Sequence, residues 1–425
     1  MKEKFKVTAL ERNWILYDIG NSAFTLLVST LIPIYFNSLA GSAGVNEDMY
    51  LSYWGYAGSI STVLVAIIAP ICGTLSDRKF KKPIFLLTVL LGCIACACLG
   101  LTSHWLWFLG IFVLAKVGFH SSLVFYDSML PEITTDKRMD NVSSMGYAYG
   151  YIGSVVPFVI CLVLVLFCDS FGLTMGGAMV CAFLITAAWW IIFSLPLLKS
   201  YQQTAYVDGK GAPLMDSFKQ LVRTFKEAKA EKHVFLYLIA FFFFINGVYT
   251  IIDMATAYGS ALGLDTTGLL LALLLTQIVA FPCAIIFGRL SAKYDTGLLI
   301  KICIICYTCI TAFGMFLVSL VLATLVGMFQ GGIQALSRSY LGKIIKPERS
   351  GEFYGLMDIC GKGASFLGTT LVAFVSQITA GIEVNVFGLQ LQNENLAVGS
   401  LIVLFCIGFA IFCKADKMNK ARIKA

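Results

Sequence analysis

The feature that most constrains this chain is a series of twelve apolar runs of roughly 20 residues each. A helix of that length is what crosses the hydrocarbon core of a bilayer. Only 13% of the residues are charged, about half the share found in soluble domains. The sequence therefore predicts an all-α integral membrane protein whose twelve spans lie near 14–37, 52–75, 84–102, 105–128, 145–168, 174–198, 233–260, 266–288, 298–318, 320–341, 353–380 and 395–413.

The basic residues predict how the chain is oriented. Of the 31 Lys and Arg, 29 lie before the first span, in the gaps after every second span or at the span ends that border those gaps, and the intervening gaps contain none. This alternation is the positive-inside pattern, so both termini are predicted to be cytoplasmic. It also accounts for the net charge of +7 without a nucleic-acid partner. We expect a multi-pass protein of a bacterial-type plasma membrane with no cleaved signal peptide.

The longest polar interval divides the spans into two sets of six. It predicts an N-terminal six-helix bundle (1–198), a cytoplasmic linker (199–232) and a C-terminal six-helix bundle (233–425). Within the linker, apolar residues alternate with basic ones at helical spacing from Leu214 to Lys229, which predicts an amphipathic helix on the membrane surface.

Two short sequences occur in both halves. "GTLSDRKFKKP" (73–83) matches "GRLSAKYDTG" (288–297), and "LPE" (130–132) matches "KPE" (346–348). Internal repeats of this kind are typical of transporters in which two related bundles move about a central site. Channels and structural membrane proteins rarely need that symmetry.

These residues also carry a family resemblance. Residues 73–83 resemble the loop 2–3 signature of the major facilitator superfamily. Five further stretches are similar to signatures of its vacuole-effluxer-like family of permeases: "YDIGNSAF" (17–24), "FYDSMLPEIT" (125–134), "SSMGYAYGYIGS" (143–154), "QGGIQALSRSY" (330–340) and "GEFYGLMDICGKGAS" (351–365). The resemblance implies two six-helix bundles with pseudo-two-fold symmetry, transport by alternating access, and amino acids as substrates.

The chain departs from the pattern of the superfamily at two informative positions. Ala292 stands in the second repeat where Asp77 stands in the first, and Lys116 is the nearest replacement for an arginine common in helix 4. The second departure leaves proton symport, antiport and uniport all open.

Candidate substrate and coupling residues lie in spans 1, 4, 7 and 10, which the resemblance implies line a central cavity. They recur at helical spacing, so each set shares a face: Asp18, Asn21, Ser22, Thr25, Lys116, His120, Asn246, Tyr249, Asp253, Gln330 and Gln334. Asp18 is either a proton site or a cap at the inner gate. Lys116 either pairs with Asp18 or Asp253 or meets an anionic group of the substrate, and His120 either titrates or packs.

Candidate gate residues lie mainly at the span ends. The resemblance implies that Asp77 and Arg78 lock the inner gate, and Asp77 could accept hydrogen bonds from amides near Gly351–Phe353, because a helix N-terminus attracts an anion. Asp358 and Lys362 have the spacing of a helical ion pair. The full predicted set is Asp77, Arg78, Asp127, Glu132, Arg338, Asp358 and Lys362.

The sequence contains no motif for ATP binding, metal binding or hydrolysis, so we expect neither an enzyme nor a cofactor. Cys303, Cys306 and Cys309 have a metal-like spacing but lie inside a span, which favours packing. The expected partners are a small solute, possible protons and the bilayer, with the protein as a monomer. Two alternatives are a lipid or glycolipid flippase and a non-transporting receptor on the same fold.

Overall fold

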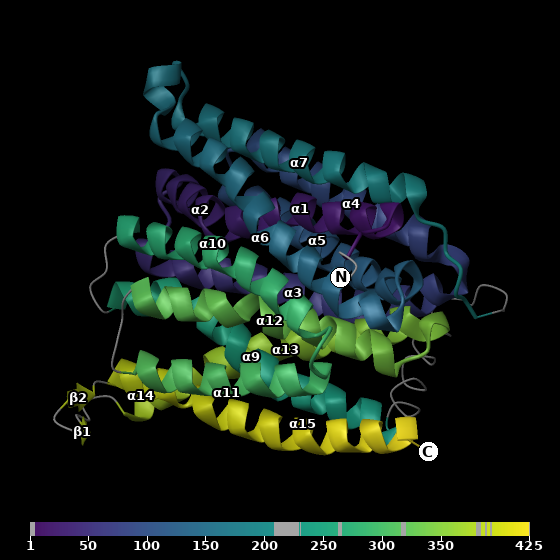
Figure 1. Ribbon diagram of the computed structural model, residues 1–425. Helices are drawn as coiled ribbons and strands as arrows, with labels where there is room; N and C mark the ends of the chain where they lie inside the picture. The colour runs from purple at the N-terminus through teal and green to yellow at the C-terminus, as the bar shows by residue number, and fades with distance from the viewer. Residues whose placement is uncertain are drawn as a thin grey trace. The chain divides into compact units, whose positions relative to one another are not determined.

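The computed structural model describes residues 5–207, 229, 231–261, 266–315, 320–379, 384–386, 389–391 and 393–424 (Figure 1). The amphipathic helix predicted at 214–229 falls almost entirely on residues outside this set. The described part is nearly all helical, as the apolar runs predict, with one two-stranded antiparallel hairpin, β1 (Val384–Val386) and β2 (Leu389–Leu391).

The helices of the first half of the sequence follow the predicted spans closely. They are α1 (Ala9–Ser29), α2 (Leu31–Ser42), α3 (Tyr50–Leu75), α4 (Lys81–Cys98), α5 (Trp105–Ile133), α6 (Asp136–Leu166) and α7 (Met175–Ser200), with short helical turns η1 (Glu47–Met49), η2 (Ser76–Phe80), η3 (Leu99–Leu101) and η4 (Cys168–Phe171). Side-chain caps determine where several of these helices begin. Thr8 and Glu11 form a capping box at α1, and Thr174 caps α7.

The second half contains the remaining spans. Its helices are α9 (Lys232–Ala261), α10 (Thr266–Leu290), α11 (Thr296–Gly314), α12 (Leu320–Ile344), α13 (Ser350–Ile378), α14 (Asn393–Gly399) and α15 (Leu401–Lys424), with the turn η5 (Pro347–Arg349) before α13. Asp295 caps α11 by accepting from the amide of Leu298.

Ten helical stretches in the described chain are long and apolar enough to cross a membrane. One of them, 52–101, contains two predicted spans, α3 and α4, joined through η2. In α13, Leu367–Ile378 forms a shorter apolar helical stretch. Among the described residues, each of the twelve predicted spans therefore coincides with a helix or, for the first and the last, with two consecutive helices. The predicted ends differ most at α6, which begins at Asp136, and at α15, which runs on to Lys424.

The helices group into two compact units, and each unit takes one short piece from the sequence half of the other. The first unit contains Met1–Thr135, Tyr149–Phe218 and Pro347–Glu352. The second contains Asp136–Ala148, Lys219–Lys346 and Phe353–Ala425. The start of α13 thus packs with the first unit, and the start of α6 packs with the second.

In the first unit, α1 packs on α7, α4 packs on both α5 and α7, and α3 packs on α5. Aromatic side chains fill the contacts: Trp14 stacks on Tyr126, and Phe24 lies against Phe119 and Trp190. These rings are almost fully buried, so the unit has an apolar interior that can hold polar side chains in fixed positions.

In the second unit, α9 packs along α15, α10 along α12, and α11 against both α12 and α15. In Figure 1, α15 is the yellow helix next to α9. The core of the second unit contains a cluster of aromatic rings formed by Tyr237, Tyr340 and Phe412. The two units therefore have separate cores.

Candidate functional site

The turn η2 between α3 and α4 positions two buried charges. Arg78 leaves the helical conformation, and Lys79 has a φ of 71°, in the left-handed region that side chains rarely adopt. This local reversal separates two helices that would otherwise continue into each other. It leaves Asp77 2% exposed and Lys81 0% exposed.

Asp77 receives the first amides of α13. Its two carboxylate oxygens accept hydrogen bonds from the backbone amides of Gly351 (2.8 Å) and Glu352 (2.9 Å). These amides have no partner inside the helix, and the helix dipole favours an anion there. Burial raises the pKa of the Asp77 carboxyl to about 7, although Lys81 and the two amides oppose the rise. Gly73 permits this close approach, because a Cβ there would lie 2.5 Å from the carbonyl oxygen of Gly351.

Lys81 joins three elements around the same point. Its Nζ donates to Glu132 Oε1 (2.5 Å), to Ser350 Oγ (2.8 Å) and to the carbonyl of Ser128 (3.2 Å), and it lies 4.0 Å from Asp77. The end of α5, the turn η2 and the start of α13 thus share one buried cation. Sequence reasoning missed this role, because it counted Lys81 only among the basic residues of a loop. The i,i+4 spacing of Asp77 and Lys81 was the available signal.

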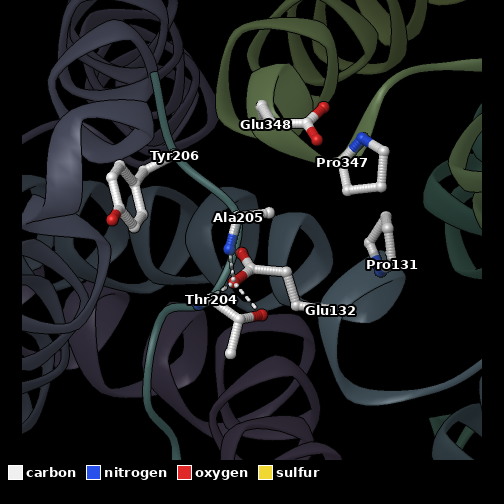
Figure 2. Close-up of a pocket in the computed structure, with 7 residues that line it drawn as sticks. All are labelled: Pro131, Glu132, Thr204, Ala205, Tyr206, Pro347 and Glu348. Carbon is white, nitrogen blue, oxygen red and sulfur yellow. Dashed lines mark hydrogen bonds between the residues drawn. The ribbon is translucent and has the colours of Figure 1, made fainter. Parts of the chain in front are cut away.

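Glu132 holds the chain that leaves α7. Its carboxylate accepts from the Tyr201 hydroxyl (2.9 Å) and from the amides of Thr204 (2.8 Å) and Ala205 (3.1 Å). Figure 2 shows the bonds from Thr204 and Ala205 meeting at this side chain. A pocket of about 480 Å³ adjoins it, lined by Pro131, Glu132, Thr204, Ala205, Tyr206, Pro347 and Glu348. Both members of the LPE/KPE repeat therefore border one pocket.

The second unit has a polar cluster of its own, around Asp140 near the start of α6. Asp140 is 4% exposed. Its carboxylate accepts from the hydroxyls of Ser339 (2.6 Å) and Thr296 (2.7 Å) and from Lys343 Nζ (2.5 Å). None of these four residues was among the predicted site residues. All the donors here are side chains.

Arg338, predicted as a gate residue, lies in the same unit and also holds the start of α6. Its guanidinium donates to the hydroxyl and the carbonyl of Ser143, at 2.9 Å each, and lies 4.3 Å from the centre of the Tyr147 ring. The side chain is buried, with 3% exposed. The start of α6 is thus fixed to α12 by charge-assisted bonds.

Within the span of α1, Asp18 is buried near the middle of the helix, with 6% exposed. Its carboxylate accepts from the Tyr126 hydroxyl (2.7 Å) and from the Asn21 amide (3.4 Å). Gly150 of α6 packs on this face: a Cβ there would lie 2.8 Å from Ser22 Oγ and 3.5 Å from Asp18 Cβ. Asn21 also donates to the carbonyl of Tyr17.

The predicted polar face of α1 becomes more exposed along the helix. Asp18 is buried, Ser22 is half-buried and Thr25 is exposed. In α5, Lys116 and His120 are both half-buried. Lys116 Nζ lies 3.7 Å from where a Cβ on Gly58 of α3 would stand, and His120 packs edge-on against Phe119.

In the second unit, Asn246 and Thr250 of α9 are fully buried and face α13 rather than open space. A Cβ on Gly368 of α13 would overlap both side chains. Tyr249 of α9 lies near Gly361, which is also in α13. Asn246 Nδ2 and Gln330 Oε1 are buried without a hydrogen-bond partner in the described part of the chain. Gln334 is half-buried.

For the other predicted residues the structure describes burial but few individual contacts. Arg78, Asp127 and Asp358 are half-buried, and each interacts with a neighbour. The side chains of Asp253 and Lys362 lie outside the described set, so the predicted Asp358–Lys362 pair stays a prediction.

Comparison with known proteins identifies the family. Residues 10–423 match the model of the family described as "Vacuole effluxer Atg22 like". The chain belongs to this Atg22-like family. An uncharacterized MFS-type transporter of Bacillus subtilis is 37% identical over 96% of this chain and 94% of the relative. Autophagy-related protein 22-1 of Emericella nidulans is 24% identical over 83% of this chain and 70% of the relative.

Solved structures show that this Atg22-like chain has the fold of the major facilitator superfamily. The human organic anion transporter MFSD10 covers 96% of the chain, and the chain covers 98% of it, with a TM-score of 0.69 at 16% identity. The E. coli fucose:proton symporter FucP gives a TM-score of 0.62 at 15% identity, with 96% and 97% coverage. The family resemblance predicted from the sequence is confirmed, and the protein is a membrane transporter, not an enzyme.

Proposed function

We propose that this Atg22-like transporter moves a small zwitterionic solute, an amino acid, by alternating access and couples the movement to protons through Asp18. Polar side chains of α1 and α5 in the first unit would contact the solute. The name of the family, vacuole effluxer, supports export as the direction to test first.

The observation that carries the proposal is the setting of Asp18. A carboxylate inside a transmembrane helix is costly, and it is usually kept for a function. Two neutral groups, the Tyr126 hydroxyl and the Asn21 amide, hold it. Tyr126 is itself fixed by stacking on Trp14, with ring centres 4.2 Å apart. These contacts hold the carboxylate in one orientation.

We also propose that the Asp77–Lys81 cluster is the inner gate, on the cytoplasmic side. Alternating access requires one end of the pathway to close by contacts that can later release. Asp77 and Lys81 bind the first residues of α13, Ser350 to Glu352, although most of α13 belongs to the other unit. A contact at the start of a helix whose remaining residues belong to the other unit suits that role.

The test is solute-evoked current in proteoliposomes, measured with an amino-acid panel with and without a pH gradient. Asp18→Asn keeps the size of the side chain and an acceptor for Tyr126, but it cannot cycle a proton. We expect it to abolish the current. Tyr126→Phe keeps the ring against Trp14 and loses the hydroxyl, and we expect a roughly tenfold loss, since bonds to charged groups contribute about 1.5–3 kcal/mol. Asp169→Asn, in the exposed turn η4, is the control and should leave the current unchanged.

Each result decides one part of the proposal. Current that persists in Asp18→Asn would overturn the coupling role of Asp18. Isotope uptake without current would show an electroneutral carrier and overturn net charge movement through Asp18. No uptake of any amino acid, combined with movement of labelled lipid between leaflets, would replace the solute proposal by a flippase.

A further inference from the structure

The segment that follows α7, Tyr201–Val207, has no helix or strand, and we call it the strap. It is bonded to the turn between α3 and α4 at three places. Gln203 Nε2 donates to the carbonyl of Ser76 (2.8 Å), and Gln203 Oε1 accepts from the amide of Lys81 (3.2 Å). The amide of Val207 donates to the carbonyl of Asp77 (2.8 Å).

The strap holds the backbone of the same residues whose side chains receive α13. All three bonds go to main-chain atoms of the turn, so they fix the positions from which the Asp77 and Lys81 side chains extend. A fourth contact reinforces this, because Lys79 Nζ lies 3.8 Å above the centre of the Tyr206 ring. Lys79 is the residue with positive φ, so the strap braces the turn at its most strained point.

The strap also fixes the second partner of Lys81. Glu132 accepts from the strap amides of Thr204 and Ala205 with one oxygen, and from Lys81 with the other. A carboxylate bonded on both oxygens cannot rotate away from Lys81 without losing strap bonds. Turn and carboxylate are therefore both held in place by the same seven residues.

The strap faces the turn before α13 across open space. The pocket of about 480 Å³ lies between the strap residues Thr204–Tyr206 and the pair Pro347–Glu348 (Figure 2). The described route from the strap to α13 therefore runs through η2 and Lys81. This two-step route makes a specific prediction about which strap residue matters.

We propose that the strap is a positioning element of the gate, which sets how firmly the start of α13 is held. This rests on the gate role proposed for Asp77 and Lys81. Gln203 is the key side chain, since it bonds both ends of the turn, at Ser76 and Lys81. Loss of its two bonds would therefore loosen the hold on α13.

Two adjacent glutamines allow a matched test. Gln203 is half-buried and bonded to the turn, whereas its neighbour Gln202 is exposed, with no hydrogen bond found for it in the described chain. The readout is hydrogen exchange of the Gly351 and Glu352 amides, measured by mass spectrometry on the full-length protein in lipid nanodiscs. These amides donate to Asp77, so their exchange reports gate opening directly, and no solute is needed.

Gln203→Ala is expected to speed exchange of the two amides by roughly fivefold to tenfold, because it removes bonds worth about 0.5–1.5 kcal/mol each. Gln202→Ala should match the wild type. Gln203→Glu keeps the acceptor for the Lys81 amide and loses the donor to Ser76, so it should fall between them.

Equal exchange in the two alanine variants would overturn the proposal. An increase of the same size throughout the first unit would also overturn it, since that would mean a general loss of stability. Because the readout does not depend on transport, a failure to find the solute leaves this test intact. A negative result here likewise leaves the assignment of Asp18 untouched.

Discussion

The turn after α3 and its repeat after α10 hold a helix start in opposite ways. In the first unit the acid is on the turn: Asp77 accepts from backbone amides of α13. In the second unit the position that repeats Asp77 is Ala292, which is exposed, and the acid is on the helix instead. Asp140 of α6 accepts from side chains of α11 and α12, among them Thr296, which stands where Lys81 stands in the first repeat.

The difference between these two clusters concerns what happens when the acid is lost. The amides of Gly351 and Glu352 are part of the backbone and cannot turn away, so a buried amide without an acceptor pays its full desolvation cost. Ser339 and Lys343 can rotate. Ser339 already shares its hydroxyl with the carbonyl of Leu336, and the side chain of Lys343 is 23% exposed. The first cluster should therefore act as a sharp two-state contact, and the second as a stable joint.

The largest expected effect comes from Asp77→Ala. Each of the two amides loses a bond to a charged acceptor worth about 1.5–3 kcal/mol, so exchange at Gly351 and at Glu352 should rise by roughly 10- to 200-fold. Asp77→Asn keeps one oxygen acceptor and should fall between Asp77→Ala and the wild type. The measurement is again hydrogen exchange in nanodiscs. Unchanged exchange in Asp77→Ala would mean that the contact does not hold the helix start.

A smaller, differently located effect is expected from Asp140→Ala. Because the donors can relax, we expect the free energy of unfolding to fall by about 1–3 kcal/mol without faster exchange at Gly351. Thermal unfolding and exchange of the same samples would measure both quantities. Asp136→Ala, an exposed acid in the first turn of α6, is the matched control. If Asp140→Ala opened the α13 contact as strongly as Asp77→Ala, the distinction between joint and gate would be wrong.

The sequence predicted those parts of the two clusters that have a local signal, and it missed those that depend on partners far away in the chain. The spans followed from apolar runs alone, and the target of Asp77 near Gly351–Phe353 followed from the charge preference of a helix start. Lys81 could not be recognised as buried, because its burial depends on Glu132 and Ser350, which are 51 and 269 residues away. Hydropathy gives no signal for such a site.

The start of α6 was placed too late for a related reason. The segment from Asp136 to Ser144 is polar, so the apolar run begins near 145. The helix nevertheless extends back to Asp136, because Asp140 and Ser143 find partners on α11 and α12. Asn246 was likewise predicted to line a cavity, since helical spacing identifies a shared face but not the neighbour that covers it. Gly368 of α13 covers this face of α9.

A pH series would test the electrostatics of the first cluster. Burial raises the pKa of Asp77 from 3.8 to about 7 in the bound state. The released state, with an ordinary carboxyl, then holds fewer protons between about pH 4 and pH 7, so the contact weakens as pH rises through that window and levels off above it. Exchange at Gly351, corrected for its intrinsic pH dependence, should rise over this range in the wild type and stay flat in Asp77→Asn. A fall with rising pH would show that Lys81 and the amides outweigh burial.

The smallest expected effect tests whether the repeat alone can make a gate. Ala292→Asp restores the acid that the first repeat has at Asp77. Ala292 is exposed, and the start of α6 is already bonded through Asp140 and Ser143, so the new carboxylate meets water instead of a helix start. We expect the free energy of unfolding to change by less than about 0.5 kcal/mol, as for most surface substitutions, and transport to remain at the wild-type rate. A clear gain in stability that disappears in the double variant Ala292→Asp/Asp140→Ala would show instead that the two acids can share the task. The second unit would then retain the capacity for a latch of the first kind, and the difference between the units would come from one residue rather than from two arrangements of the whole cluster.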